Sequence, residues 1–206
     1  MDESSRRELF ETQTSKQYEL IGRFVVSISQ CELWLRNGIV FMIPGAGNSD
    51  VQQYVSILTG HKTMMASSWI EVFEAMLTEY DLWGEGGQKA ILEQVCKDFR
   101  KMMSRRNKLL HSAAFIGWAR SEDRDFHSTR FMKFKISKQE GFGLESDVPK
   151  NTDALEAWVK EVRETEKALI TVSLWIPFKL SGEDYRLQFS QSGGRWVCDA
   201  NISGFE

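Results

Sequence analysis

Residues 20–41 read LIGRFVVSISQCELWLRNGIVF. Apolar residues recur in this stretch every three or four positions, which is the spacing of one face of an α-helix. The stripe consists of Ile21, Val25, Ile28, Leu35 and Ile39, with Phe24 and Cys31 at its edge. The pattern predicts a long amphipathic helix from about Glu8 to Phe41, ended by the Pro44-Gly45 pair. A long helix with one apolar face needs partner helices, so the stretch points to a helical bundle.

Four further segments show helical spacing or helix-capping residues. They are a short helix at Val51–Leu58, helices at Thr63–Tyr80 and Gln88–His111 separated by Gly84, Gly86 and Gly87, and a last helix that begins at Asn151–Asp153 and ends at Pro177. The second of these carries acidic residues on its polar face (Glu71, Glu74, Glu79 and Asp81), which we interpret as a face exposed to solvent.

Between the last two helices the pattern changes from helical spacing to alternation. Ala114–Ala119, Thr129–Ile136 and Phe142–Glu145 are typical of short strands and predict an antiparallel hairpin or a three-stranded flap. The fold class is therefore mainly α, a bundle of four to five helices with a small antiparallel β insertion at about 113–146 before the last long helix. We expect the bundle to span residues 1–177, and residues 178–206 to form a C-terminal tail with short strands at Tyr185–Phe189 and Arg195–Cys198.

The composition restricts the class of protein and its location. The chain has 206 residues and a net charge of −3, so one domain of ordinary size without a globally basic surface is expected. Its three cysteines lie far apart and do not suggest a disulfide framework. The charged N-terminus lacks the apolar stretch of a signal peptide, and no apolar run approaches the roughly 18–20 residues that cross a bilayer. These features predict a cytoplasmic protein without a membrane partner.

Most familiar catalytic motifs are absent from the sequence. There is no H-E-x-x-H or paired C-x-x-C for zinc, no phosphate-binding G-x-x-x-x-G-K-[ST] loop, no dinucleotide-binding G-x-G-x-x-G after a strand, and no G-x-S-x-G nucleophile elbow. We therefore expect neither a metal nor an organic cofactor.

The second half of the predicted helix at Gln88–His111 is strongly basic. It carries Lys97, Arg100, Lys101, Arg105, Arg106 and Lys108 against the single acid Asp98, and His111 follows. Cations at a helix C-terminus offset the negative end of the helix dipole, so this segment has a purely structural interpretation as well as a functional one.

Arg106 continues the apolar stripe of its helix, which runs through Leu92, Phe99 and Met102 or Met103 and goes on to Leu110. An arginine in such a stripe needs a partner, because an unpaired buried charge costs several kcal/mol. The apolar stripe of the first helix passes through Glu32 in the same way. We hypothesise that Glu32 and Arg106 meet across the bundle; the alternative is that both side chains extend to water from the stripe edge.

Residues 106–111 read RNKLLH and resemble the R-N-x-x-x-H form of the R-x(4–6)-H motif of HEPN domains. The resemblance extends over approximately Leu20–Pro177, with the motif near the end of a later helix of a bundle. Arg105 with His111, and Arg120 with His127, also satisfy the looser spacing. The resemblance implies a metal-independent endoribonuclease, or a relative that binds RNA or nucleotides without cleaving. Many HEPN proteins are bacterial toxins or defence effectors that act as dimers.

The resemblance assigns the catalytic roles to Arg106 and His111, with Asn107 orienting them, and makes RNA the substrate. Arg105, Lys108 and Lys101 would bind RNA, and Glu32 would be a structural partner of the site. Arg106 and His111 are about 140° apart around an ideal helix. They converge if the last turn unwinds or if two copies of the helix meet, which favours a homodimer with a composite basic cleft. Any antitoxin would be encoded separately. The alternative function is a non-catalytic helical module that binds proteins or nucleotides.

Overall fold

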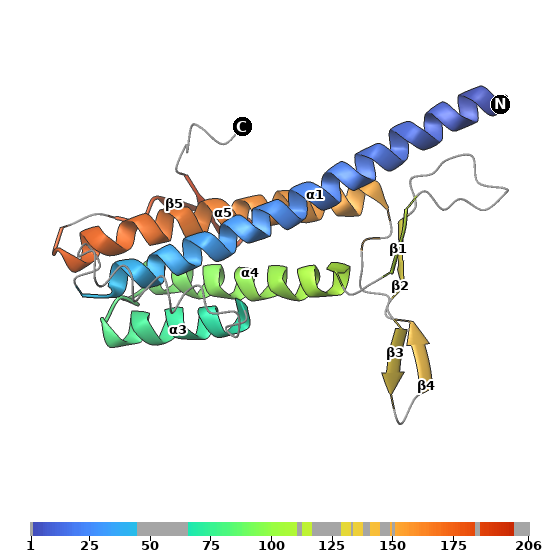
Figure 1. The fold of residues 1–206 in the computed structure, drawn as a ribbon. Coiled ribbons are helices and arrows are strands. Elements are labelled where there is room, and N and C mark those ends of the chain that lie inside the picture. The colour runs from blue at the N-terminus through green and yellow to red at the C-terminus, as the bar shows by residue number, and fades with distance from the viewer. Residues whose placement is uncertain are drawn as a thin grey trace. The chain divides into compact units, whose positions relative to one another are not determined.

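The computed structural model describes residues 2–44, 66–110, 113–116, 129–132, 134–137, 141–144, 149, 151–183 and 186–199. This part of the chain is mainly helical (Figure 1), as the sequence predicts. Its helices are α1 (Glu3–Met42), α3 (Ala66–Glu79), α4 (Gly87–Leu110) and α5 (Thr152–Leu180). The short helix predicted at Val51–Leu58 lies outside the described residues.

The chain divides into two compact units. The first unit contains Met1–Ser27 and Ser104–Val162, and the second contains Ile28–Met103 and Arg163–Glu206. The helices α1, α4 and α5 each contribute one part to each unit.

The helix α1 begins at a capped N-terminus. The backbone N–H of Ser5 donates a hydrogen bond of 2.7 Å to Oδ1 of Asp2, which satisfies one of the donors that a helix start leaves unpaired. This hydrogen bond lowers the pKa of the Asp2 carboxyl. In the first unit α1 buries Leu20 and Phe24, and the Phe24 ring packs 5.4 Å from the ring of Trp158 on α5.

The buried face of α1 is turned slightly from the predicted one. Phe24 and Cys31, expected at the edge of the stripe, are only 1% and 0% exposed, whereas Ile21 and Val25 are half-buried. In the second unit the same helix buries Ile28, Cys31, Leu35, Ile39 and Met42. Periodicity alone identifies a face within a few tens of degrees, and the neighbouring side chains decide its centre.

The core of the second unit forms where α1, α3 and α5 come close together. A Cβ atom at Gly38 would lie 2.8 Å from Cε2 of Phe73 and 3.1 Å from Oγ of Ser173, so this position accepts no side chain without rearrangement. Oγ of Ser173 donates a hydrogen bond of 2.7 Å to the backbone oxygen of Trp34. The absence of a side chain at Gly38 is therefore what permits this close packing.

The α3–α4 connection contains the glycines that the sequence marks as helix breakers. Gly84 and Gly86 have φ angles of 61° and 56°, in the left-handed region that glycine adopts without strain. Nε2 of Gln88, in the first turn of α4, donates a hydrogen bond of 2.9 Å to the backbone oxygen of Leu82. The break between the two helices is thus confirmed.

In the described parts of the β insertion, the strands form two hairpins. Strands β1 (Ala113–Ile116) and β2 (Thr129–Met132) pair antiparallel, and so do β3 (Phe134–Ser137) and β4 (Gly141–Leu144). The antiparallel insertion is confirmed, but the three-stranded flap is wrong. The predicted strand Thr129–Ile136 divides into β2 and β3, and each of them has its own partner.

The helix α5 starts as predicted and ends later than predicted. The Asn151 side chain accepts a hydrogen bond of 2.9 Å from the backbone N–H of Ala154, which makes Asn151 the N-cap. The helix continues through Pro177 to Leu180. A proline in a helix costs about 3 kcal/mol, and the burial of the preceding Trp175 and Ile176, at 1% and 0% exposure, offsets that cost.

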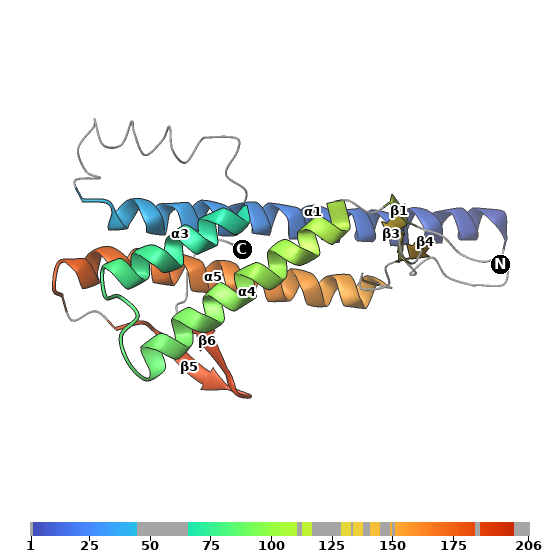
Figure 2. The ribbon, with the colours of Figure 1, turned by 90° about the horizontal axis from the view of Figure 1, so that it is seen from below.

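The C-terminal segment forms a hairpin that packs on the helices of the second unit (Figure 2). Its strands are β5 (Phe189–Ser192) and β6 (Arg195–Cys198). They are joined by Gly193 and Gly194, whose φ angles of 57° and 79° suit a tight hairpin turn. The second predicted strand is confirmed, and the first lies later in the chain than expected.

Candidate functional site

The basic segment predicted for α4 lies on that helix from Lys97 to Lys108. Lys97, Arg100 and Lys101 are exposed and belong to the second unit. Arg105, Arg106 and Lys108 are half-buried and belong to the first. The segment therefore combines exposed cations with half-buried ones.

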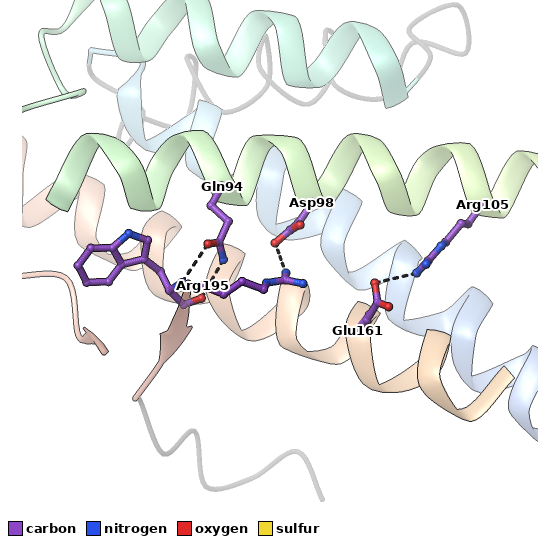
Figure 3. Close-up of polar contacts among 6 residues, drawn as sticks. Gln94, Asp98, Arg105, Glu161 and Arg195 are labelled. Carbon is purple, nitrogen blue, oxygen red and sulfur yellow. Dashed lines mark hydrogen bonds and ion pairs between the residues drawn. The ribbon is translucent and has the colours of Figure 1, made fainter. Parts of the chain in front are cut away.

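In the first unit Arg105 is held by two partners on α5. Its Nη1 lies 2.9 Å from Oε2 of Glu161, and its guanidinium carbon lies 4.6 Å from the centroid of the Trp158 ring. The ion pair is shown in Figure 3. The two charged side chains are only 18% and 31% exposed, so solvent screens this pair less than a surface pair. An RNA phosphate at Arg105 would have to compete with Glu161.

The last turn of α4 carries the first part of the R-N-x-x-x-H segment. Arg106 is half-buried and the neighbouring Asn107 is exposed. Leu109 is 5% exposed and Leu110 is 50% exposed, so of the two leucines that could continue the apolar stripe, Leu109 does so. His111 lies outside the described residues. The arrangement of Arg106, Asn107 and His111 as a catalytic group thus stays a prediction.

Glu32, the predicted partner of Arg106, is a half-buried residue of α1 in the second unit. Its position on a mostly buried helix face agrees with the interruption of the apolar stripe seen in the sequence. The pairing of Glu32 with Arg106 stays a prediction.

In the second unit Arg100 forms a two-pronged ion pair with Glu74 of α3. Nη1 of Arg100 lies 2.7 Å from Oε1 of Glu74, and Nη2 contacts Oε2. This hydrogen-bonded contact raises the pKa of the Arg100 guanidinium. The prediction that Glu74 belongs to a solvent-exposed acidic face is therefore wrong. Glu74 instead neutralises one of the cations of the basic segment.

Asp98, the one acid within the basic segment, is paired with a residue far along the chain. Its Oδ2 accepts a hydrogen bond from Nη2 of Arg195 on β6. One turn earlier on α4, the Gln94 side chain accepts a hydrogen bond of 2.9 Å from the backbone N–H of Trp196 and donates one of 2.8 Å to its backbone oxygen. Figure 3 shows both contacts. On α5, Thr171 Oγ1 lies 3.0 Å from Cys198 Sγ.

These anchors were not identified from the sequence. Glu161, Trp158 and Gln94 lie in ordinary amphipathic patterns, and their partners are between 53 and 102 positions away, at distances along the chain that no local spacing reveals. The sequence showed a surplus of cations in α4, which left open whether any of them pairs with an acid. It did not indicate which acids these would be.

The described residues contain no group of three or more His, Cys, Asp or Glu side chains placed to hold a metal ion. The buried thiols are poor nucleophiles, because burial raises the pKa of Cys96 to about 12 and also raises that of Cys31. No helix in the described ranges is long and apolar enough to cross a membrane.

Fold and site together define a mainly helical protein with a small antiparallel β insertion and a basic segment in the C-terminal half of one helix. Comparison with protein-family models, with curated proteins and with solved structures finds no match.

Proposed function

We propose that the protein is a HEPN-like, metal-independent endoribonuclease in which Arg106 and His111 act together on RNA. The observation that carries the proposal is the sequence RNKLLH at residues 106–111, whose first five residues form the last turn of α4. Arg105, directly before it, is anchored to Glu161 and Trp158. This anchor supports a fixed orientation for the helix end that carries Arg106.

The chemistry requires a base near the ribose and a positive charge near the phosphate. His111 would take the proton of the 2′-hydroxyl, because an imidazole titrates near neutral pH. The 2′-oxygen then attacks the phosphorus, and the bond to the 5′-oxygen breaks. Arg106 would stabilise the negative charge that builds on the phosphorane oxygens. The products are a 2′,3′-cyclic phosphate and a 5′-hydroxyl, whose proton comes from the protonated imidazole.

The roles of the other predicted site residues follow from this chemistry. Asn107 would orient the pair, and Lys101 and Lys108 would bind the RNA backbone. If Glu32 engages Arg106, Arg106 becomes a positioning residue and Lys108 takes over the phosphate contact. We further propose a homodimer, in which two copies of the helix bring Arg106 and His111 into one cleft. A role as a bacterial toxin or defence effector in the cytoplasm, with a separately encoded antitoxin, fits this chemistry.

The competing proposal is a non-catalytic module that binds another protein. The observation that favours it is the exposure of large apolar side chains on α1 in the first unit, where Tyr18 is 64% and Val26 59% exposed. Isolated apolar residues are common on surfaces, so this observation carries less weight than the motif.

Cleavage of a fluorescent single-stranded RNA in the presence of EDTA distinguishes the two proposals. We expect the wild-type full chain to cleave and to leave cyclic phosphate ends. The His111→Ala variant should lose about 100-fold or more in rate, as expected for loss of a general base. His127→Ala is the matched control and should cleave like the wild type. A wild type without activity, or a His111→Ala variant of equal activity, would leave only the binding module.

A further inference from the structure

Two hydrogen-bond donors in the second unit have no acceptor among the described residues. They are Nε of Arg36 on α1 and Nε1 of Trp69 on α3, and both atoms are buried. The guanidinium carbon of Arg36 lies 5.2 Å from the centroid of the Trp69 ring, so the two donors belong to one cluster. Trp69 is 3% exposed and Arg36 is half-buried.

Such a pair of donors is unusual for a folded protein. More than 90% of buried polar groups have a hydrogen-bond partner, and a buried donor without one costs roughly 1–3 kcal/mol. Two comparable groups in the described part of the chain have acceptors. Nε1 of Trp83 donates a hydrogen bond of 2.9 Å to Oγ1 of Thr78, and Arg105 pairs with Glu161. The cluster of Arg36 and Trp69 therefore points to an acceptor from outside the described chain.

The chemistry of the cluster specifies the kind of acceptor. It offers N–H donors from two helices together with one positive charge, and no described acid is paired with Arg36. The guanidinium lies over the Trp69 ring in a cation–π contact. A water molecule would satisfy the donors but would not offset the charge.

We propose that Arg36 and Trp69 form a binding site for an oxyanion, a phosphate or carboxylate group. Oxygen atoms of such a group would accept from Nε of Arg36 and from Nε1 of Trp69. Hydrogen bonds between a guanidinium and an oxyanion are stronger than those between neutral groups. The site lies in the second unit and consists of residues that have no role in the proposed RNA cleavage. The two proposals can therefore be tested independently.

Thermal unfolding of the full chain at constant ionic strength tests the site. The ligands are inorganic phosphate, acetate and adenosine monophosphate, with sodium chloride as the reference. A ligand at ten times its Kd should raise the wild-type Tm by about 3–6 °C. The Trp69→Phe variant retains an aromatic ring for Arg36 and loses only the indole N–H, so its Tm should rise much less. Trp83→Phe removes an indole N–H that already has an acceptor, and this control should respond like the wild type.

Each outcome decides the proposal. A Trp69-dependent rise with phosphate or acetate supports the site and identifies the group, and a larger rise with adenosine monophosphate than with phosphate identifies a nucleotide as its source. The proposal is overturned if none of the three ligands raises the wild-type Tm, or if Trp69→Phe responds like Trp83→Phe. If Trp69→Phe does not fold, as judged by circular dichroism, Arg36→Gln replaces it and must abolish the same shift.

Discussion

The contact of Arg105 with Glu161 and Trp158 decides whether Arg105 is a packing residue or an RNA ligand. The perturbation is a double-mutant cycle of Arg105→Ala and Glu161→Ala. Exposed ion pairs contribute about 0.2–1 kcal/mol, and hydrogen bonds to charged groups about 1.5–3 kcal/mol. The pair has a 2.9 Å contact and side-chain exposures of 18% and 31%, so we expect a coupling energy of about 1 kcal/mol.

The single variants should differ because Arg105 has a second partner. Arg105→Ala also loses the contact with the Trp158 ring, worth about 1 kcal/mol, so its total loss should be about 2–3 kcal/mol. Glu161→Ala leaves that contact in place and should cost about 1–2 kcal/mol. Urea unfolding followed by circular dichroism measures all four proteins. A coupling energy near zero, or a larger loss for Glu161→Ala than for Arg105→Ala, would refute the reasoning.

The same variants test the role in RNA binding. Because Nη1 of Arg105 is already paired with Glu161, we expect folded Arg105→Ala to bind single-stranded RNA within about twofold of the wild type. Lys108→Ala is the comparison and should weaken binding several-fold. Fluorescence anisotropy, at a temperature where every variant is folded, measures the affinities. A large loss for Arg105→Ala alone would contradict this expectation and show that Arg105 contacts RNA.

Two further predictions concern the second unit and the first half of α1. Gly38→Ala should destabilise the protein by about 1 kcal/mol or more in urea unfolding, because the new Cβ atom would lie 2.8 Å from Phe73. The control Gly22→Ala, where the new Cβ atom would have no atom within 4 Å, should stabilise α1 by up to about 1 kcal/mol. Equal effects of the two substitutions would contradict the close packing at Gly38. A thiol reagent at pH 8 should label the half-buried Cys198 first and Cys96 only when the protein unfolds, because burial raises the pKa of Cys96 to about 12 and leaves little thiolate. Mass spectrometry of the native protein measures the order of labelling. Equally fast labelling of both cysteines would contradict the prediction.

Much of the fold can be predicted from the helical periodicity of the sequence. The helices α1, α3 and α4 were recognisable because backbone hydrogen bonds and side-chain faces in a helix repeat over three to four residues, within the reach of a local pattern. The glycines between α3 and α4 and the Asn151 cap were recognisable for the same reason, since their effect is local. The basic character of α4 and its RNKLLH end were likewise visible in the sequence.

Apart from Glu32 on the first helix, the candidate site was predicted as a set of residues on one helix. The contacts of Arg105 and Asp98 were not predicted, because Glu161 lies 56 positions after Arg105 and Arg195 lies 97 positions after Asp98. No spacing rule connects such distant residues. The predicted roles of Arg106 and His111 rest on the motif, and the cleavage experiment above tests them.

By itself, then, the sequence determined which of the described segments are helical, where the chain breaks between α3 and α4, and that many cations lie in α4. The tertiary structure alone decided that α5 continues through Pro177, that the C-terminal hairpin packs on α4 through Gln94, and that Arg105 lies on Trp158. The physical reason is the range of the interactions. A helix is stabilised by neighbours along the chain, whereas the choice of partner for a charge, a ring or a strand edge depends on which surfaces the folded chain brings together.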